Sequence, residues 1–173
     1  MVRGSPNPQY FGLPARLKRA RKFACLTRTG LADRVGGDQT TALDIEMGRR
    51  LPTVGTVARL AIGLGVSAGW LGFGLGEMES AKLQASCDGM ATRLQCVRLA
   101  NGFSKAALAR MVNLSPTALA NIERGAQSGV EVIAALAKAL GISPAWLAFH
   151  EGPQVLPSRR RGRPPAQSSA PVG

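Results

Sequence analysis

Positive charge is the most abundant chemistry in this sequence. Lysine and arginine number 22 against 10 aspartate and glutamate residues, so the formal net charge at pH 7 is +12 and the isoelectric point is near 11.2. An excess of this size favours a polyanionic partner, with nucleic acid ahead of an acidic membrane surface. The first question is therefore which elements would present basic and hydrogen-bonding side chains to such a partner.

Side chains suited to making and breaking bonds are scarce by comparison. The only histidine is His150, and the three cysteines (Cys25, Cys87 and Cys96) contain no CxxC pair. These counts favour neither a metal cluster nor a disulfide framework, and they fit a reducing cytoplasm. Paired carboxylates, a nucleophile elbow and a Gly-rich phosphate loop do not stand out either. We expect a protein that binds its partner without catalysis, cofactor or metal.

An internal repeat organises the chain. Residues 31–48, LADRVGGDQTTALDIEMG, align with residues 108–125, LARMVNLSPTALANIERG, and further on LGVSAGWLGF aligns with LGISPAWLAF. The N-terminus has no apolar stretch typical of a signal peptide. The repeat predicts two copies of one domain with a linker between them and disordered ends. The predicted segments are the N-terminus 1–11, domains 12–75 and 88–150, the linker 76–87 and the tail 151–173.

Each copy is predicted to form five short helices, so the fold class is all-α. Aromatic residues make up only 5% of the chain, and the apolar residues recur at helical spacing. In the second copy Ser104 and Ser115 are placed as N-caps, Pro116 takes the first helical position, and Gly125 ends the helix. The apolar, glycine-rich run 60–76 is short for a membrane span and is better explained as two core helices.

Helices two and three of each copy form a helix-turn-helix pattern. The stretch SKAALARMVNLSPTALANIERG resembles the phage-repressor and Cro-type (XRE-like) helix-turn-helix family, and GISPAWLAF resembles that family's fifth helix. The resemblance is more specific in the second copy than in the first. It implies compact five-helix bundles like those of lambda repressor, and double-stranded DNA as the partner. Helix three would enter the major groove while helix two crosses the DNA backbone.

The resemblance also implies which residues face the bases. Amide side chains can bond adenine through N6 and N7, threonine can contact a base edge or a thymine methyl, and aspartate can accept from cytosine N4. An alternative is that one copy serves only stability or pairing and reads no sequence. The base-facing positions fall on Gln39, Thr40 and Asp44 in the first copy and on Pro116, Thr117 and Asn121 in the second.

Phosphate contacts are expected from basic residues near helices two and three. Arg28 and Lys105 begin helix two of each copy, where free backbone N–H groups favour an anion. Arg49 and Arg50 follow helix three of the first copy. Residues 12–75 contain ten basic and four acidic side chains, a net charge of +6, whereas residues 88–150 reach +3. On charge alone, the first copy should be the tighter nonspecific binder of DNA. In its first helix, Lys18 and Arg19 could equally belong to a solvated face.

Two further predictions concern ion pairs and the tail. Arg21 with Glu46, and Arg98 with Glu123, have equal spacing and match a pair that the family uses to join helix one to the end of helix three. We expect them to position helices rather than to read bases. In the tail, RRRGRPP resembles an AT-hook, which would lay Arg161, Gly162, Arg163 and Pro164 along the minor groove of A/T-rich DNA. The alternative there is a generic basic tail that adds phosphate affinity.

Three hypotheses for function follow from these features. The leading one is a bacterial or phage-type transcription regulator associated with the nucleoid in the cytoplasm, acting as a homodimer or as an intramolecular pseudo-dimer. The second is an architectural, nucleoid-type protein with little sequence preference. The third is an interaction module of the antitoxin or adaptor kind, which holds a protein partner. Of the functions considered, the sequence supports an enzyme least.

Overall fold

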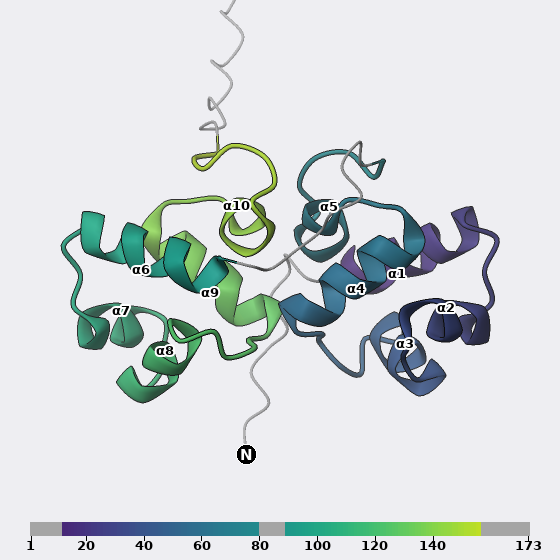
Figure 1. Cartoon of the computed structure of the whole chain (residues 1–173), viewed down its shortest axis with the longest axis horizontal. Coiled ribbons are helices and arrows are strands. Elements are labelled where there is room, and N and C mark those ends of the chain that lie inside the picture. The colour runs from purple at the N-terminus through teal and green to yellow at the C-terminus, as the bar shows by residue number, and fades with distance from the viewer. Residues whose placement is uncertain (1–11, 80–88, 157–173) are drawn as a thin grey trace, which may run out of the picture.

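The computed structural model describes residues 12–79 and 89–156, and it confirms the all-α prediction. The described residues form ten helices in two bundles of five, which we call domain one (α1–α5) and domain two (α6–α10) (Figure 1). The helices of domain one are α1 (Gly12–Phe23), α2 (Arg28–Val35), α3 (Gln39–Glu46), α4 (Val54–Leu64) and α5 (Ala68–Phe73). Those of domain two are α6 (Met90–Ala100), α7 (Lys105–Met111), α8 (Pro116–Ile122), α9 (Val130–Leu140) and α10 (Pro144–Phe149).

Local capping residues determine where most of these helices begin. Of the ten helices in the described residues, seven begin after a Ser, Thr or Asp whose side chain accepts a hydrogen bond from a backbone N–H of the first turn. These caps are Thr27, Asp38, Thr53, Ser67, Ser104, Ser115 and Ser143. The turn before α3 uses Gly36 at φ 61°, and the turn before α8 uses Asn113 at φ 56°, because both residue types tolerate the left-handed region.

A core of leucine, isoleucine, valine and alanine holds each bundle together. Ala42 and Ile45 of α3 are buried, as are Leu119 and Ile122 of α8, so each of these helices fixes one face against its bundle. In each domain α3 or α8 packs against the preceding short helix, as a helix-turn-helix pattern predicts. The opposite face of α3 and of α8 faces away from the core.

The two domains pack against each other through α5 and α10. The rings of Phe73 and Phe149 lie 5.9 Å apart between centroids. On the same boundary an isolated antiparallel bridge joins Thr53 to Gly129, flanked by backbone hydrogen bonds between the two domains. The domains are related by an approximate two-fold axis that runs between α5 and α10, and α3 and α8 lie on the same edge of the molecule (Figure 1).

The apolar run 60–76 lies in α4, α5 and the turns that follow them. Leu60, Leu64, Leu71 and Phe73 are buried in the core, in agreement with the prediction of two core helices, whereas Ile62 of the same run is exposed. Within the described ranges, no helix is both long enough and apolar enough to cross a membrane.

Candidate nucleic-acid interface

The exposed face of α3 and of α8 carries the side chains that were expected to face the bases. Gln39 and Thr40 are exposed at the start of α3, and Asp44 is half-buried one turn later. In α8 the corresponding residues Pro116, Thr117 and Asn121 are all exposed. Because both helices lie on one edge of the molecule, a single extended partner could reach both sets.

Neighbouring side chains hold three of these polar groups. The Thr29 hydroxyl of α2 donates to Oε1 of Gln39 at 3.0 Å. Arg49 forms an ion pair with Asp44 at 3.6 Å, which places a positive charge beside the acid on this face. In domain two, Nη2 of Arg124 donates to Oδ1 of Asn121 at 2.6 Å. The amides are therefore oriented before any partner arrives.

The residues that begin helix two in each domain are paired with glutamates. Nε of Arg28 donates to Oε2 of Glu46 at 2.9 Å, and Nζ of Lys105 lies 3.5 Å from Oε2 of Glu123. The Arg28 side chain is 42% exposed and the Lys105 side chain 48%, so about half of each remains in solvent. If either side chain also contacted a DNA phosphate, the same positive charge would interact with both the phosphate and the glutamate.

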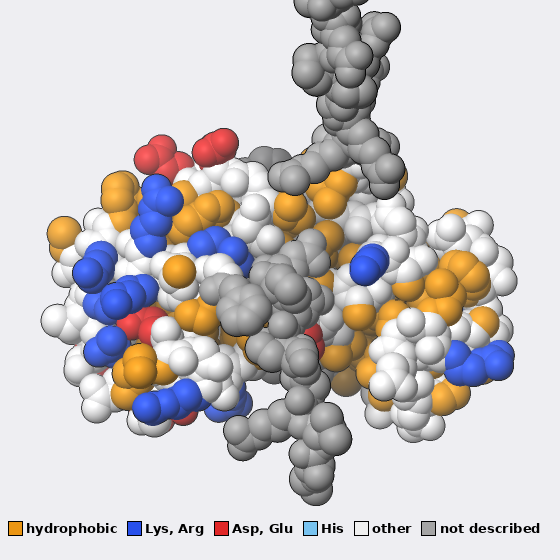
Figure 2. Space-filling model, turned by 180° about the vertical axis from the view of Figure 1, so that it is seen from behind, with side chains coloured by type: hydrophobic (Ala, Val, Ile, Leu, Met, Phe, Trp, Pro, Cys, Tyr) orange, Lys and Arg blue, Asp and Glu red, His pale blue; other side chains and the backbone are white. Residues whose placement is uncertain are grey.

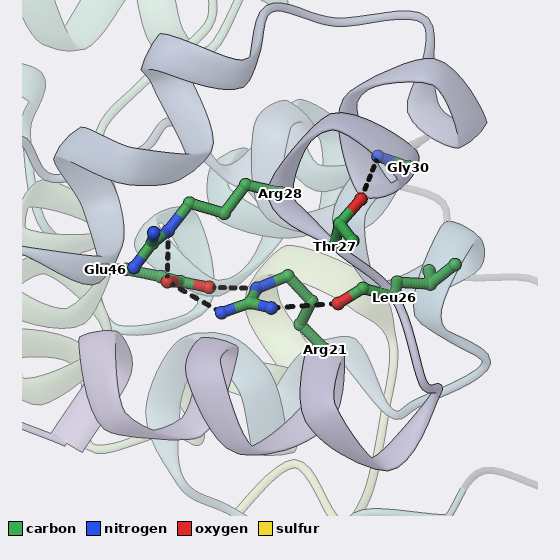
Figure 3. Close-up of polar contacts among 6 residues, drawn as sticks. All are labelled: Arg21, Leu26, Thr27, Arg28, Gly30 and Glu46. Atoms are coloured by element: carbon green, nitrogen blue, oxygen red, sulfur yellow. Dashed lines mark hydrogen bonds and ion pairs between the residues drawn. The ribbon is translucent and has the colours of Figure 1, made fainter.

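A buried ion pair anchors the C-terminal end of α3 and of α8. In domain one Nε of Arg21 donates to Oε1 of Glu46 at 2.6 Å, and Nη1 donates to the Leu26 carbonyl oxygen at 2.8 Å (Figure 3). Domain two repeats this arrangement with Arg98, Glu123 and the Phe103 carbonyl oxygen. The glutamate side chains are only 1% and 3% exposed. These pairs join α1 to α3 and α6 to α8, which suits residues that position a helix.

Family comparisons recognise the same two units. A family described as "Helix-turn-helix domain" matches residues 13–69, and a family described as "Helix-turn-helix" matches residues 97–147. The chain carries two helix-turn-helix domains. No solved structure matches the chain. Helix-turn-helix domains place their second helix against DNA, so the matches point to α3 and α8 as DNA-binding helices.

Positive charge is distributed unequally over the two helix-turn-helix domains. Viewed from behind, Lys and Arg side chains gather over domain one and are sparse over domain two (Figure 2). Lys18, Arg19 and Lys22 of α1 are exposed, as are Arg49 and Arg50 after α3. This distribution agrees with the net charges of the two repeats and makes domain one the stronger attractor of a polyanion.

One basic residue of α1 has a structural role that the sequence interpretation did not assign. Nε of Arg16 donates to the Leu71 carbonyl oxygen at 3.0 Å, and Nη2 donates to that of Gly72 at 3.1 Å. Arg93 makes the equivalent contacts with Leu147 and Ala148 in domain two. A guanidinium at the C-terminal end of α5 or α10 satisfies carbonyl groups and complements the helix dipole. The alignment of Arg16 with Arg93 in the repeat was the available signal.

The AT-hook prediction concerns residues that the structure does not describe. Arg161, Gly162, Arg163 and Pro164 lie in the segment 157–173, outside the described ranges, and so does most of the predicted linker. The hook therefore stays a prediction from the sequence RRRGRPP.

The environment of Glu46 predicts how pH affects domain one. Burial opposes ionisation, but hydrogen bonds and positive charge from Arg21 and Arg28 outweigh it, so the pKa of Glu46 lies below its ordinary value near 4.5. A carboxyl with a lowered folded-state pKa stabilises the fold above its unfolded pKa, and this contribution is lost as the pH falls through the folded value.

We therefore expect domain one to unfold at a lower urea concentration when the pH falls below about 4.5. Glu46 should contribute at most about 1.4 kcal/mol per pH unit to the change in the free energy of unfolding. Glu46→Gln, compared at each pH, should have a shallower dependence because it lacks this proton. Identical pH slopes for the two proteins would contradict the role assigned to Glu46.

Proposed function

We propose that this protein is a DNA-binding transcription regulator of the phage-repressor and Cro type, which reads the major groove through α3 and α8. The observation that carries the proposal is the joint placement of these helices. Their exposed faces lie on one edge of the molecule, and each is fixed at its C-terminal end by a buried ion pair. Rigid positioning of a short helix with exposed amides and hydroxyls is what base readout needs.

The proposed regulator acts as an intramolecular pseudo-dimer. Glu151, just beyond α10, caps the N-terminus of α5 in the other domain: Oε2 accepts from the Ser67 hydroxyl at 2.6 Å and from the Gly69 N–H at 2.8 Å. Gln127 accepts from the Gly55 N–H at 3.2 Å across the same boundary. These contacts support one chain spanning two neighbouring half-sites, each read by one domain. Because the two reading helices differ in sequence, the two half-sites would differ as well.

Two finer parts of the proposal rest on sequence alone. The tail would add a minor-groove contact through Arg161 and Arg163, next to the major-groove sites. A regulator of this kind would work in the cytoplasm, bound to the nucleoid.

Low-specificity architectural binding is the second candidate. The observation that favours it is the high positive charge together with Pro116, whose side chain cannot donate to a base. The test is to select bound sequences from a random DNA pool and compare the best sequence with its scrambled version at about 150 mM salt. Specific regulators commonly discriminate by about 10³ or more. A ratio below about tenfold would favour the architectural function.

The amide side chains provide a residue-level test of base reading. Gln39→Ala and Asn121→Ala should each cost about 1–3 kcal/mol of binding free energy at one base step and leave binding to scrambled DNA unchanged. Arg50→Ala is a matched control, because loss of a phosphate contact weakens binding to all sequences and lowers the salt slope by about 1. Equal loss on selected and scrambled DNA for both amide variants would argue against a reading role.

A further inference from the structure

The amide of Asn121 is held in one orientation by Arg124. Nη2 of Arg124 donates to Oδ1 of Asn121 at 2.6 Å, while Nε of Arg124 donates to the Ala120 carbonyl oxygen at 3.2 Å. A guanidinium has only donors, so its partner must be the amide oxygen and not the amide nitrogen. The contact therefore turns Oδ1 toward Arg124 and leaves the Nδ2 hydrogens for an incoming base.

This orientation changes which base Asn121 suits. An asparagine that bonds adenine accepts from N6 through its oxygen while it donates to N7. With Oδ1 engaged by a charge-assisted bond, the Asn121–Arg124 pair offers N–H donors to the groove. Guanine presents two acceptors, N7 and O6, side by side in the major groove. To bond adenine, Oδ1 would have to accept from N6 with its second lone pair while it still binds Arg124, so the pair is better matched to guanine.

Domain one holds its amide in a different way. The residue that aligns with Arg124 in the repeat is Met47, whose thioether cannot donate. Gln39 is held instead by the hydroxyl of Thr29, and the residue that aligns with Thr29 in domain two is Ala106. Each domain therefore has one orienting side chain that the other lacks, although the scaffold residues repeat.

We propose that Arg124 is a positioning residue that sets the base preference of domain two to guanine by holding Asn121 as a donor. This inference rests on the proposed function, because it requires that α8 reads the major groove. Arg124 need not touch the base itself, because it acts through Asn121.

The test is the base-preference profile of the full chain on a random DNA pool, measured for the wild type, Arg124→Met, Arg124→Lys and Asn121→Ala. The wild type should prefer guanine by about tenfold at one step. Arg124→Met, which installs the residue of domain one, frees Oδ1 and should move the preference at that step toward adenine. Arg124→Lys should retain part of the guanine preference, because an ammonium group can still donate to Oδ1.

A double variant and a matched charge control make the result decisive. In the Asn121→Ala background, Arg124→Met should cause no further change at that step, since Arg124 acts through Asn121. Arg110→Ala removes another exposed positive charge, which bonds the Ala106 carbonyl oxygen, and should leave the profile unchanged.

Uniform weakening on all sequences by Arg124→Met, with a salt slope lowered by about 1, would identify a phosphate contact and overturn the inference. An unchanged profile in Arg124→Met would overturn it as well, while leaving the proposed function in place. A wild-type chain with no base preference at any step is a separate result, which would refute the proposed function itself.

Discussion

Thr40→Glu and Thr117→Glu are each expected to weaken binding of the full chain to its selected DNA site by about 10²–10⁴-fold. Both threonines are exposed at the second position of their helix, α3 or α8. A glutamate there is compatible with the helix, because an acidic side chain near a helix N-terminus is favourable by about 0.3–1 kcal/mol. It would, however, place a carboxylate against the DNA and prevent that domain from docking.

The size of the effect follows from the linkage between the domains. Contacts from Glu151 and Gln127 hold the two helix-turn-helix domains together, so that a second domain docks as an intramolecular step once the first is bound. Removing either docking event forfeits this gain in avidity, even if the intact domain binds as before. The variants therefore test whether both domains engage one DNA molecule.

Binding should be measured together with thermal unfolding, which both variants should leave nearly unchanged. Gln154→Glu is the matched control, because it adds the same charge at an exposed position. Gln154 belongs to the segment that follows α10, and Figure 1 shows this segment on the edge opposite α3 and α8. Weakening by only one of the two threonine variants would mean that the other domain does not contact DNA and serves stability or pairing. If Gln154→Glu weakens DNA binding as much as the threonine variants do, the added negative charge alone explains the effect.

The bundles could be predicted from the sequence because their signals are local or repeated. Ser115 and Pro116 start α8 through interactions within one turn. In the turn before α8, Asn113 adopts the left-handed backbone conformation that the turn requires. The common spacing of Arg21 with Glu46 and of Arg98 with Glu123 placed each pair between the same two helices. Two copies of one pattern supply independent evidence for each element, which a single copy would lack.

The interface between the domains had no comparable signal. Glu151 lies more than eighty residues from Ser67 in the chain, and its position in the first repeat is occupied by Leu75, so alignment of the copies hides it. The pair of Arg124 with Asn121 was also missed, although the two residues are only three positions apart, with Asn121 in the last turn of α8 and Arg124 in the turn that follows it. Such short sequence separation is a local signal that includes the residues just after α8.

Glu123→Ala is expected to lower the free energy of unfolding of domain two by about 3–5 kcal/mol. The Glu123 side chain is 3% exposed, and its carboxylate accepts two hydrogen bonds from Arg98, at 2.6 and 3.2 Å. Nζ of Lys105 lies 3.5 Å from Oε2 of the same carboxylate. Its removal leaves the guanidinium of Arg98, a side chain only 6% exposed, in the core with one remaining carbonyl partner. A charge buried without its counter-ion carries most of the cost.

Urea unfolding at pH 7 measures this loss. Glu131→Ala is the control for an exposed acid in the same domain, and it should cost no more than about 1 kcal/mol because Glu131 lies in the first turn of α9. The double variant Arg98→Met, Glu123→Leu separates the two contributions, because it removes both charges and fills their volume with apolar atoms. If the stranded charge dominates, the double variant will be more stable than Glu123→Ala although it lacks the same pair. An unchanged unfolding midpoint in Glu123→Ala would show that α8 is positioned without this ion pair, and that the packing of Leu119 and Ile122 alone fixes the helix for DNA.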